Sequence, residues 1–254
     1  MYTKSLQMGD VNHVNRSLPK LLTLWFSFTE QPEGGNNGSK LKETCAGINE
    51  TLKEATKKVP ARIWFVCISQ LVSRAGHPNK KTLSIITAIL IKLLTEYPKQ
   101  GIWHIAGMIH SKDPARQATG RYIVQQALRS LITKGVRHQE DSKMLEQAEL
   151  LFSNLIQLSQ FPLDKGVREF KWGTSAKLSH PFIAKFLLPS QGVLNINLSS
   201  NILSKLLPKL NDFEEDHEFI QTFHSSVDVL NSKERPKIVR ITTSHGVEAK
   251  VFLF

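Results

Sequence analysis

Cysteines and long apolar runs are both scarce in this sequence of 254 residues. The two cysteines, Cys45 and Cys67, lie within helical patterns and show no Cys-x-x-Cys spacing, which predicts buried free thiols in a reducing compartment. The longest apolar stretch, Ile85 to Ile91, is far shorter than the ~20 residues that cross a bilayer. The opening Met1 to Asp10 is mostly polar and contains no secretory leader. We therefore expect a soluble protein without a membrane partner.

Signatures of catalytic sites are also missing. The sequence contains no glycine-rich phosphate loop, no Gly-x-Ser-x-Gly elbow and no His-Glu-x-x-His. His104 and His110 fall on different faces of a helix, so they do not form a metal-ligand pair. The run Asp212 to Glu214 differs by one letter from the Asp-Phe-Gly of kinases, but it lies in an acidic stretch and we interpret it as coincidence. We predict no catalytic residue and no metal site in this chain.

Positive charge is the one feature in excess, with a formal net charge of +11. The basic residues are spread along the chain without interleaved aromatics, and an acidic run from Asp212 to Glu218 interrupts any continuous basic face. Dispersed charge is typical of a solvated surface. Nucleic-acid binding, which would show a strongly salt-dependent affinity, is therefore the interpretation that we rank last.

Helical patterns fill the first part of the chain. Ser17 can cap a first helix, with Pro19 in its first turn. The next pattern, Ser39 to Val59, places its apolar residues on one stripe. The stretch Ala61 to Gly76 is apolar almost all round in its first half, which predicts one central helix. A further apolar helix from Lys80 to Tyr97 ends at proline.

The later patterns continue in the same way. After Pro114 a helix runs through Leu131 to Gly135, and an apolar stripe from Leu145 to Leu158 predicts another. Helix pairs joined by short turns, each pair close to forty residues, predict a mainly α fold, an α-solenoid of TPR/HEAT-like helix pairs.

The pattern changes near residue 162, where we expect a small α/β segment. Residues 190–201 alternate as an exposed strand does, and residues 202–210 predict a short helix. Lys237 to Phe254 predicts a β-hairpin around a turn at Ser244, His245 and Gly246. A lone hairpin is marginal in water. The hairpin therefore pairs with earlier strands, or the chain ends inside a sheet.

Three motifs carry a resemblance to a known family. They are Ser-Leu-Pro-Lys-Leu-Leu-x-Leu-Trp at Ser17 to Trp25, the run Ser69 to Arg74 followed by His77, and Arg235-Pro236-Lys237 before a strand. In this order they resemble the ATR-like checkpoint kinases, which are phosphatidylinositol-3-kinase-related serine/threonine kinases.

The resemblance implies three parts. Residues 1–162 would be the C-terminal part of the family's helical FAT region, residues 163–222 a connector, and residues 223–254 the truncated beginning of the kinase N-lobe. The turn of Ser244, His245 and Gly246 would then lie over the phosphates of the nucleotide. The family has an acidic residue where His245 stands and a lysine where Val247 stands, so this turn departs from the pattern.

The resemblance also implies a function. The chain would be a fragment of a nuclear kinase that acts in DNA damage and replication-stress checkpoint signalling. That kinase would use ATP and Mg²⁺, phosphorylate Ser or Thr followed by Gln when single-stranded DNA accumulates, and act with an ATR-interacting protein. The helical part would clamp and regulate its own kinase domain. The fragment itself would be inactive and would bind no cofactor, because phosphoryl transfer needs a lysine, a base and metal-holding side chains positioned together.

An alternative from another class stays open. A free-standing helical-repeat scaffold that binds a protein partner fits everything before residue 160 equally well. The end of the chain favours the kinase interpretation, because a scaffold should end on a polar capping helix and this chain ends on the apolar Val251 to Phe254.

Overall fold

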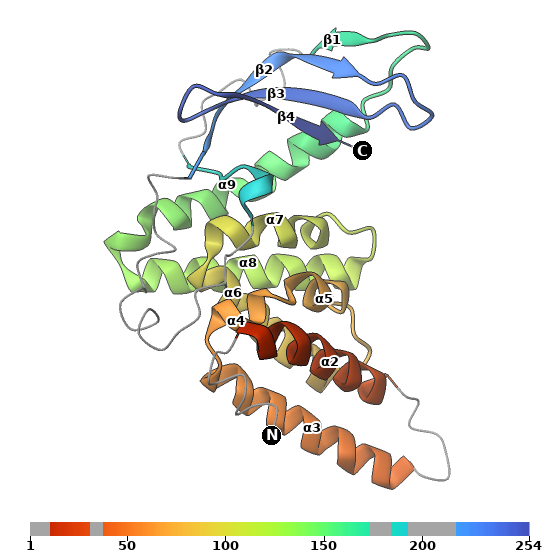
Figure 1. Cartoon of the computed structure of the whole chain (residues 1–254), viewed down its shortest axis with the longest axis vertical. Helices are drawn as coiled ribbons and strands as arrows, with labels where there is room; N and C mark the ends of the chain where they lie inside the picture. Colours follow the sequence, from red (N-terminus) through yellow and green to blue (C-terminus); the bar gives the residue numbers. More distant parts are fainter. Residues whose placement is uncertain (1–10, 31–37, 173–183, 193–216, 254) are drawn as a thin grey trace. The chain divides into compact units, whose positions relative to one another are not determined.

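The structure is a computed structural model that describes residues 11–30, 38–172, 184–192 and 217–253. These residues fall into two compact units, divided between residues 130 and 131, and each unit is described by itself. The predicted fold class is confirmed, because the described part of the first unit consists of paired helices and the second contains a small antiparallel sheet with the expected hairpin (Figure 1). Among the described residues, no helix is long and apolar enough to span a membrane.

The first unit is built from seven described helices, the last of which ends in the second unit. In chain order they are α2 (Val11–Thr29), α3 (Gly38–Lys58), α4 (Ala61–Phe65), α5 (Ile68–Ser73), α6 (Lys80–Glu96), α7 (Pro98–Ile109) and α8 (Pro114–Lys134).

Helix α6 is the centre of this unit, since it contacts α3, α4, α5 and α7. Its fully buried residues come in adjacent pairs, such as Ile89 with Leu90, so its apolar stripe is wide enough to pack against several neighbours. The sequence assigned the central position to Ala61 to Gly76 instead, and α4 and α5 from that stretch both pack against α6.

Helix α2 begins at Val11, so the predicted start at Ser17 is wrong. Pro19 lies inside the helix. Proline has no N–H, so the carbonyl of Asn15 loses its usual donor. Asn15 is exposed and water can replace that donor, while the buried Val14 and Leu18 extend the apolar face toward the N-terminus.

The single helix predicted over Ala61 to Gly76 is also wrong, because the chain breaks into α4 and α5. The N–H of Cys67 donates to the carbonyl of Trp64 at 3.0 Å, which tightens the last turn of α4. Cys67 then leaves the helical region with φ −112° and ψ 20°. β-branched residues at positions 63, 66 and 68 crowd a continuous helix here, which favours the break.

Two predicted helix boundaries are confirmed, the start of α6 at Lys80 and the end of α8 before Gly135, whereas the cap at Asn79 and the start of α7 at Pro98 were not predicted. The side chain of Asn79 accepts hydrogen bonds from the N–H groups of Lys81 and Thr82 and so caps α6. Pro98 begins α7. Gly135 ends α8 with φ 90°, a conformation that glycine adopts without steric cost.

Basic side chains close the C-terminal ends of two helices. Lys92 Nζ on α6 donates to the carbonyl of Thr56 at 3.0 Å and to that of Val59 at 2.7 Å, at the end of α3. Arg116 on α8 donates to the carbonyl of Ser73, the last residue of α5, at 3.3 Å. The last carbonyls of a helix carry partial negative charge, so cations stabilise them.

Helices α7 and α8 come into close contact at Gly120. A Cβ atom at this position would lie 2.8 Å from Met108 Cβ and 3.0 Å from the backbone N of Ile109. Only glycine fits, because two of the three nearest atoms belong to the backbone of α7, which cannot move aside.

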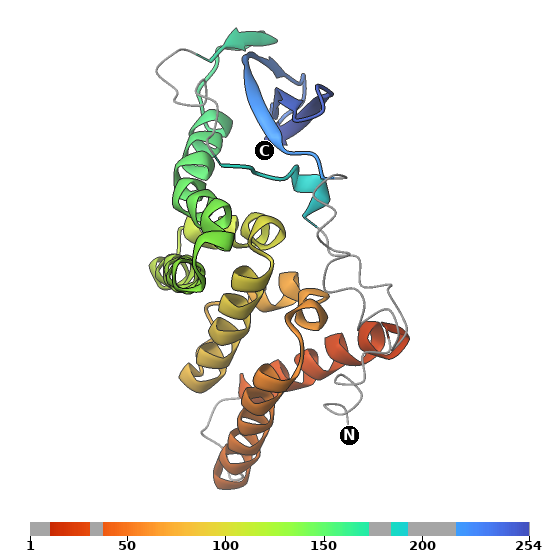
Figure 2. The ribbon, with the colours of Figure 1, turned by 90° about the vertical axis from the view of Figure 1, so that its left-hand side faces the viewer.

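The second unit combines one long helix with the sheet. Helix α9 (Gln139–Ser159) follows a short 3₁₀ turn and packs against the last strand of the sheet (Figure 2). The predicted apolar stripe from Leu145 to Leu158 is buried. The strands are β1 (Glu169–Lys171), β2 (Ile220–Val229), β3 (Lys237–Thr243) and β4 (Glu248–Leu253), antiparallel in the order β1-β2-β3-β4.

The terminal hairpin is confirmed as β3 and β4, and it is not alone. β3 also pairs with β2, which pairs with β1. β3 is the most buried strand, and it holds Val239 and Ile241 in the core. The strand predicted over residues 190–201, the helix predicted over residues 202–210 and the Asp212 to Glu214 run lie wholly or mostly outside the described residues.

Candidate functional site

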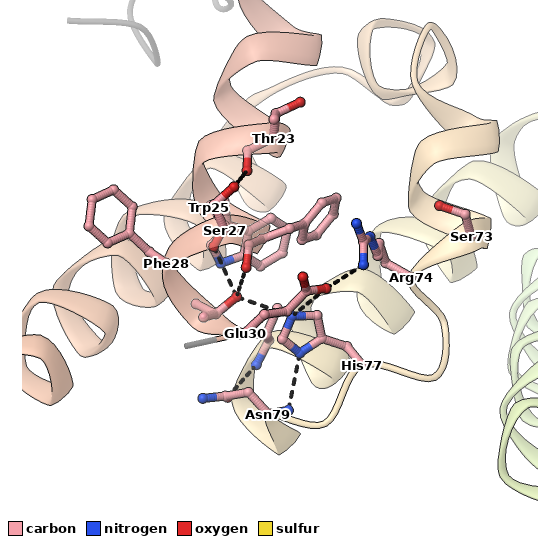
Figure 3. Close-up of polar contacts among 12 residues, drawn as sticks. Thr23, Trp25, Ser27, Phe28, Glu30, Ser73, Arg74, His77 and Asn79 are labelled. Carbon is pink, nitrogen blue, oxygen red and sulfur yellow. Dashed lines mark hydrogen bonds and ion pairs between the residues drawn. The ribbon is translucent and has the colours of Figure 1, made fainter. Parts of the chain in front are cut away.

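The motif Ser69 to Arg74, with His77, forms a polar cluster between α2 and the turn that leads into α6 (Figure 3). Arg74 pairs with Glu30, just after α2, and its guanidinium lies 5.6 Å above the ring of Phe26. Gln70 donates to Thr23 on α2 at 3.1 Å. These contacts attach α2 to α5.

His77 lies at the buried centre of this cluster, and its side chain has no exposed surface. The N–H of Asn79 donates to His77 Nδ1 at 3.1 Å, so Nδ1 must be an acceptor and Nε2 must carry the ring proton. Nε2 lies 3.2 Å from Thr29 Oγ1, which in turn donates to the carbonyl of Trp25 at 2.9 Å. The neutral imidazole therefore completes a directed chain of hydrogen bonds.

Burial lowers the pKa of His77. The Glu30 carboxylate, 3.8 Å from Nε2, raises this pKa, and the Arg74 guanidinium lowers it further. Burial outweighs the carboxylate, because removing imidazolium from water is costly. His77 is consequently held in its neutral form.

A second chain of hydrogen bonds extends from the cluster into the core. Trp25 Nε1 donates to Asn49 Oδ1 at 2.8 Å, and Thr82 Oγ1 donates to the same oxygen at 3.2 Å. All three residues are buried and come from α2, α3 and α6. Sequence reasoning missed the roles of Asn49 and Thr82, since no local pattern marks a hydrogen bond between distant helices. The cluster joins helices, and its polar groups have partners within the fold, so its arrangement supports a structural role.

The predicted nucleotide turn of Ser244, His245 and Gly246 connects β3 to β4. Gly246 has φ 75°, and its N–H donates to the carbonyl of Thr243 at 2.9 Å. The N–H of Ser244 donates to the carbonyl of Phe219 at 2.8 Å, and its Oγ accepts from the N–H of Phe219 at 3.1 Å. The turn is exposed, and the structure brings its three predicted residues together.

The turn does not by itself fit a triphosphate. The amide groups of Ser244 and Gly246 already donate within the sheet, and the Val247 N–H is 3.2 Å from Thr243 Oγ1. A phosphate loop needs free amides or a cation, and residues 244–247 contain no lysine or arginine. A role in nucleotide binding stays a prediction and would need further groups. Lys250, the lysine nearest to the turn along β4, is exposed.

The third motif, Arg235-Pro236-Lys237, lies where the chain enters β3. Arg235 donates to three backbone carbonyls and has φ 46°, and Lys237 is buried with its Nζ directed at the carbonyl of Ser159. The sequence marked this motif but gave no sign that both cations bind backbone carbonyls.

An open, mostly apolar groove of about 490 Å³ runs between α6 and α8. Lys80 and Tyr122 are the only titratable residues that line it, beside apolar side chains such as Ile91. This lining supports binding of an apolar segment and offers no catalytic pair. Among the described residues, no group of three or more His, Cys, Asp or Glu side chains could hold a metal ion.

The chain is similar to known proteins along nearly its whole length. Residues 47–152 match the family model described as serine/threonine-protein kinase ATR-like, HEAT repeats. Serine/threonine-protein kinase ATR of Oryza sativa subsp. indica is 29% identical over 253 residues, which cover 97% of this chain and 9% of the relative. Protein kinase rad3 of Schizosaccharomyces pombe is 24% identical over 257 residues, which cover 96% of this chain and 11% of the relative.

Solved structures share the fold. The structure titled "FAT and kinase domain of CtTel1" matches 95% of this chain and 16% of its own, with a TM-score of 0.56 and 18% identity. The "Complete CtTel1 dimer with C2 symmetry" matches 95% of this chain and 9% of its own, with a TM-score of 0.58. The chain spans about a tenth of the length of the curated relatives that it matches.

Proposed function

We propose that this chain is part of a serine/threonine kinase, because it is related to the ATR-like serine/threonine-protein kinases over 97% of its length. In such a kinase, this chain would be the segment in which helical repeats lead into the nucleotide-binding lobe. The helical part would support the kinase domain and regulate it.

The order of the parts is the observation that carries this proposal. An array of helix pairs is followed by α9 and then by an antiparallel sheet, and this order matches a structure that contains FAT and kinase domains over 95% of the chain. The division into a FAT part at residues 1–162, a connector at 163–222 and an N-lobe part at 223–254 belongs to the proposal.

The names of the relatives support a proposal for the parent activity. A serine/threonine kinase transfers the γ-phosphoryl group of ATP with the help of Mg²⁺. We propose that the parent protein phosphorylates Ser or Thr followed by Gln, in the nucleus, in response to DNA damage and replication stress. An ATR-interacting protein would bring it to single-stranded DNA.

The role of this chain in that reaction would be positional. Phosphoryl transfer depends mostly on orientation and charge stabilisation. The described residues contain no acidic cluster that could hold Mg²⁺, and the β3–β4 turn offers few free amides. The sheet would carry the turn, and the helices would hold the sheet.

A peptide phosphorylation assay tests the proposal. The longest natural protein that contains this chain should transfer phosphate from ATP to a peptide with Ser-Gln, and it should act poorly on a matched peptide with Ser-Asn. The chain alone should transfer none. A longer protein that neither binds ATP nor phosphorylates the Ser-Gln peptide would exclude the kinase.

A partner-binding scaffold is the second candidate, and the groove between α6 and α8 favours it. Tyr122 is 51% exposed at this groove, as expected of a residue that a partner covers. Tyr122→Ala should abolish capture of a scaffold's partner without lowering the melting temperature. If the variant instead leaves every interaction of the longer protein intact, this candidate fails.

A further inference from the structure

Arg235 holds the segment between α9 and β1 through three backbone carbonyls. Its Nη1 donates to the carbonyl of Leu163 at 2.9 Å, and its Nη2 donates to those of Asp164 and Val167, each at 3.0 Å. The planar guanidinium presents several donors in a fixed geometry, so it can hold three acceptors at once. Lysine has no equivalent arrangement.

The backbone of Arg235 is strained. Its φ of 46° is the only positive φ of a non-glycine residue among the described residues. An L-residue in this region brings its Cβ close to the following carbonyl, and the next residue is Pro236, which restricts the backbone further. Strain of this kind persists only where the surroundings determine the conformation. The three hydrogen bonds to carbonyl groups hold Arg235 in this conformation.

Lys237, two residues after Arg235, contacts the end of α9. It is 5% exposed, and its Nζ donates to the carbonyl of Ser159, the last residue of α9. Burial lowers the pKa of Lys237, and the neighbouring Arg235 lowers it further. The Lys237 ammonium is directed at a backbone carbonyl, whereas Arg240 on the same strand pairs with the carboxylates of Glu169 and Asp228. The partial negative charge at the C-terminal end of α9 offsets the cost of burying the Lys237 ammonium.

An aromatic cluster joins the end of α9 to β1 as well. Phe161, just after α9, stacks on Phe170 of β1 with centroids 5.4 Å apart and meets the edge of Trp172 at 5.4 Å. The end of α9 is therefore fixed to both β1 and β3.

We propose that Arg235 and Lys237 form a latch that makes the first residues of β3 follow the end of α9. A displacement of α9 would then be passed along β3 to the turn of Ser244 to Gly246. This inference rests on the proposed function in one respect, because the turn matters to catalysis only if it lies over a nucleotide. Arg235 and Lys237 are positioning residues in this proposal, and they act through the strand.

A distance measurement on the whole chain tests the latch. Spin labels at Gln157 on α9 and His245 in the turn are both on exposed positions, and Cys45→Ser removes the accessible native thiol. We expect a narrow distance distribution in the otherwise unchanged chain. Arg235→Ala and Lys237→Met should each lose the narrow component. Arg235→Lys should lose part of it, because lysine cannot hold three carbonyls.

Arg240 provides the matched control. It lies on the same strand and carries the same charge, but it pairs with Glu169 at 3.8 Å and Asp228 at 3.6 Å, both within the sheet. Arg240→Ala should keep the narrow component. Retention of that component in Arg235→Lys and Lys237→Met, or its equal loss in Arg240→Ala, would overturn the latch. Should Arg235→Ala fail to fold, these other variants still decide the question.

A kinetic measurement separates the latch from the proposed function. In the longest natural protein, Arg235→Lys should raise the KM for ATP more than it lowers kcat. If the unchanged protein has no kinase activity, the proposed function fails while the distance measurement still stands. If the protein is active and neither constant changes in Arg235→Lys, the latch does not reach the nucleotide and this part of the proposal is overturned.

Discussion

His77 shows how a single backbone N–H group can fix the protonation state of a side chain. Because Asn79 N–H faces Nδ1, protonation of His77 would place two donors against each other. The charged groups that face the ring are Glu30, which follows α2, and Arg74, which follows α5. Protonation would therefore break the contact that orients the turn before α6.

We predict that acid weakens the fold through His77. The folded pKa lies below the unfolded value of about 6.5, so the unfolded chain binds the proton first. The stability that neutral His77 contributes is complete above about pH 6.5 and is lost as the pH falls through the window below it. Urea unfolding from pH 7.5 to 5.5 should show a steeper decline in the unchanged chain than in His77→Gln.

The exposed His245 supplies the control for this comparison. The stability profile of His245→Gln should run parallel to that of the unchanged chain. Parallel profiles for His77→Gln and the unchanged chain would contradict the role of His77.

The two cysteines should react differently. Burial raises the pKa of the Cys67 thiol to about 11, whereas Cys45 is only partly buried. The thiolate is the reactive form. At pH 8 a thiol reagent should therefore label Cys45 in the native chain and Cys67 only after unfolding. In Cys45→Ser, rapid native labelling would show that Cys67 is accessible after all.

At the scale of helices, cations at C-terminal ends take the place of some glycine caps. Lys92 contributes two contacts to the end of α3, where no glycine follows. We predict that Lys92→Met lowers the free energy of unfolding by about 1–3 kcal/mol, because two carbonyls lose a charged donor. Lys81→Met, at an exposed position on the same helix, should change it little. Equal effects of the two variants in urea titrations would rule out the cap.

Variants of Trp25 in α2 and Trp64 in α4 should distinguish how much packing and hydrogen bonding each contribute to stability. Trp25 and Trp64 are both buried, and replacing either by Ala should cost about 3–5 kcal/mol. Trp25→Phe also loses the bond to Asn49, whereas Trp64 Nε1 has no partner among the described residues. We therefore expect Trp25→Phe to cost about 1 kcal/mol more than Trp64→Phe. Calorimetry that ranks them in the opposite order would contradict the assigned bond.

Local sequence patterns predicted the helices better than they predicted which strands pair in the sheet. Helices α3, α6, α8 and α9 follow from their apolar periods and from stop signals such as Pro98 and Gly135. The start of α2 was missed because an internal proline resembles a first-turn proline. The strands that pair with the hairpin were missed. β1 has only three residues, which is too short for a clear local pattern. Its pairing with β2 is not a local signal, because almost fifty positions separate these two strands. The motifs pointed to the clusters around His77 and Arg235, but their roles depend on backbone carbonyls distant in sequence.

At the scale of the whole chain, part of the positive charge serves the fold. Lys92, Arg116 and Lys237 are all directed at backbone carbonyls of the chain itself. The net charge of +11 therefore overstates the charge that is available to a partner.

We predict weak binding to nucleic acid for this reason. In fluorescence anisotropy, a labelled single-stranded oligonucleotide should show no saturable binding to the chain at physiological salt. Tight binding that weakens steeply with added salt would restore the nucleic-acid interpretation, since that slope reports released counterions.

The close approach at Gly120 has a mechanical consequence for α7 and α8. Any side chain at this position would meet the backbone of α7, so Gly120 sets how close the two helices can lie. Sliding α8 along α7 would bring the larger neighbouring side chains against the same backbone, so the glycine also fixes the register of the pair.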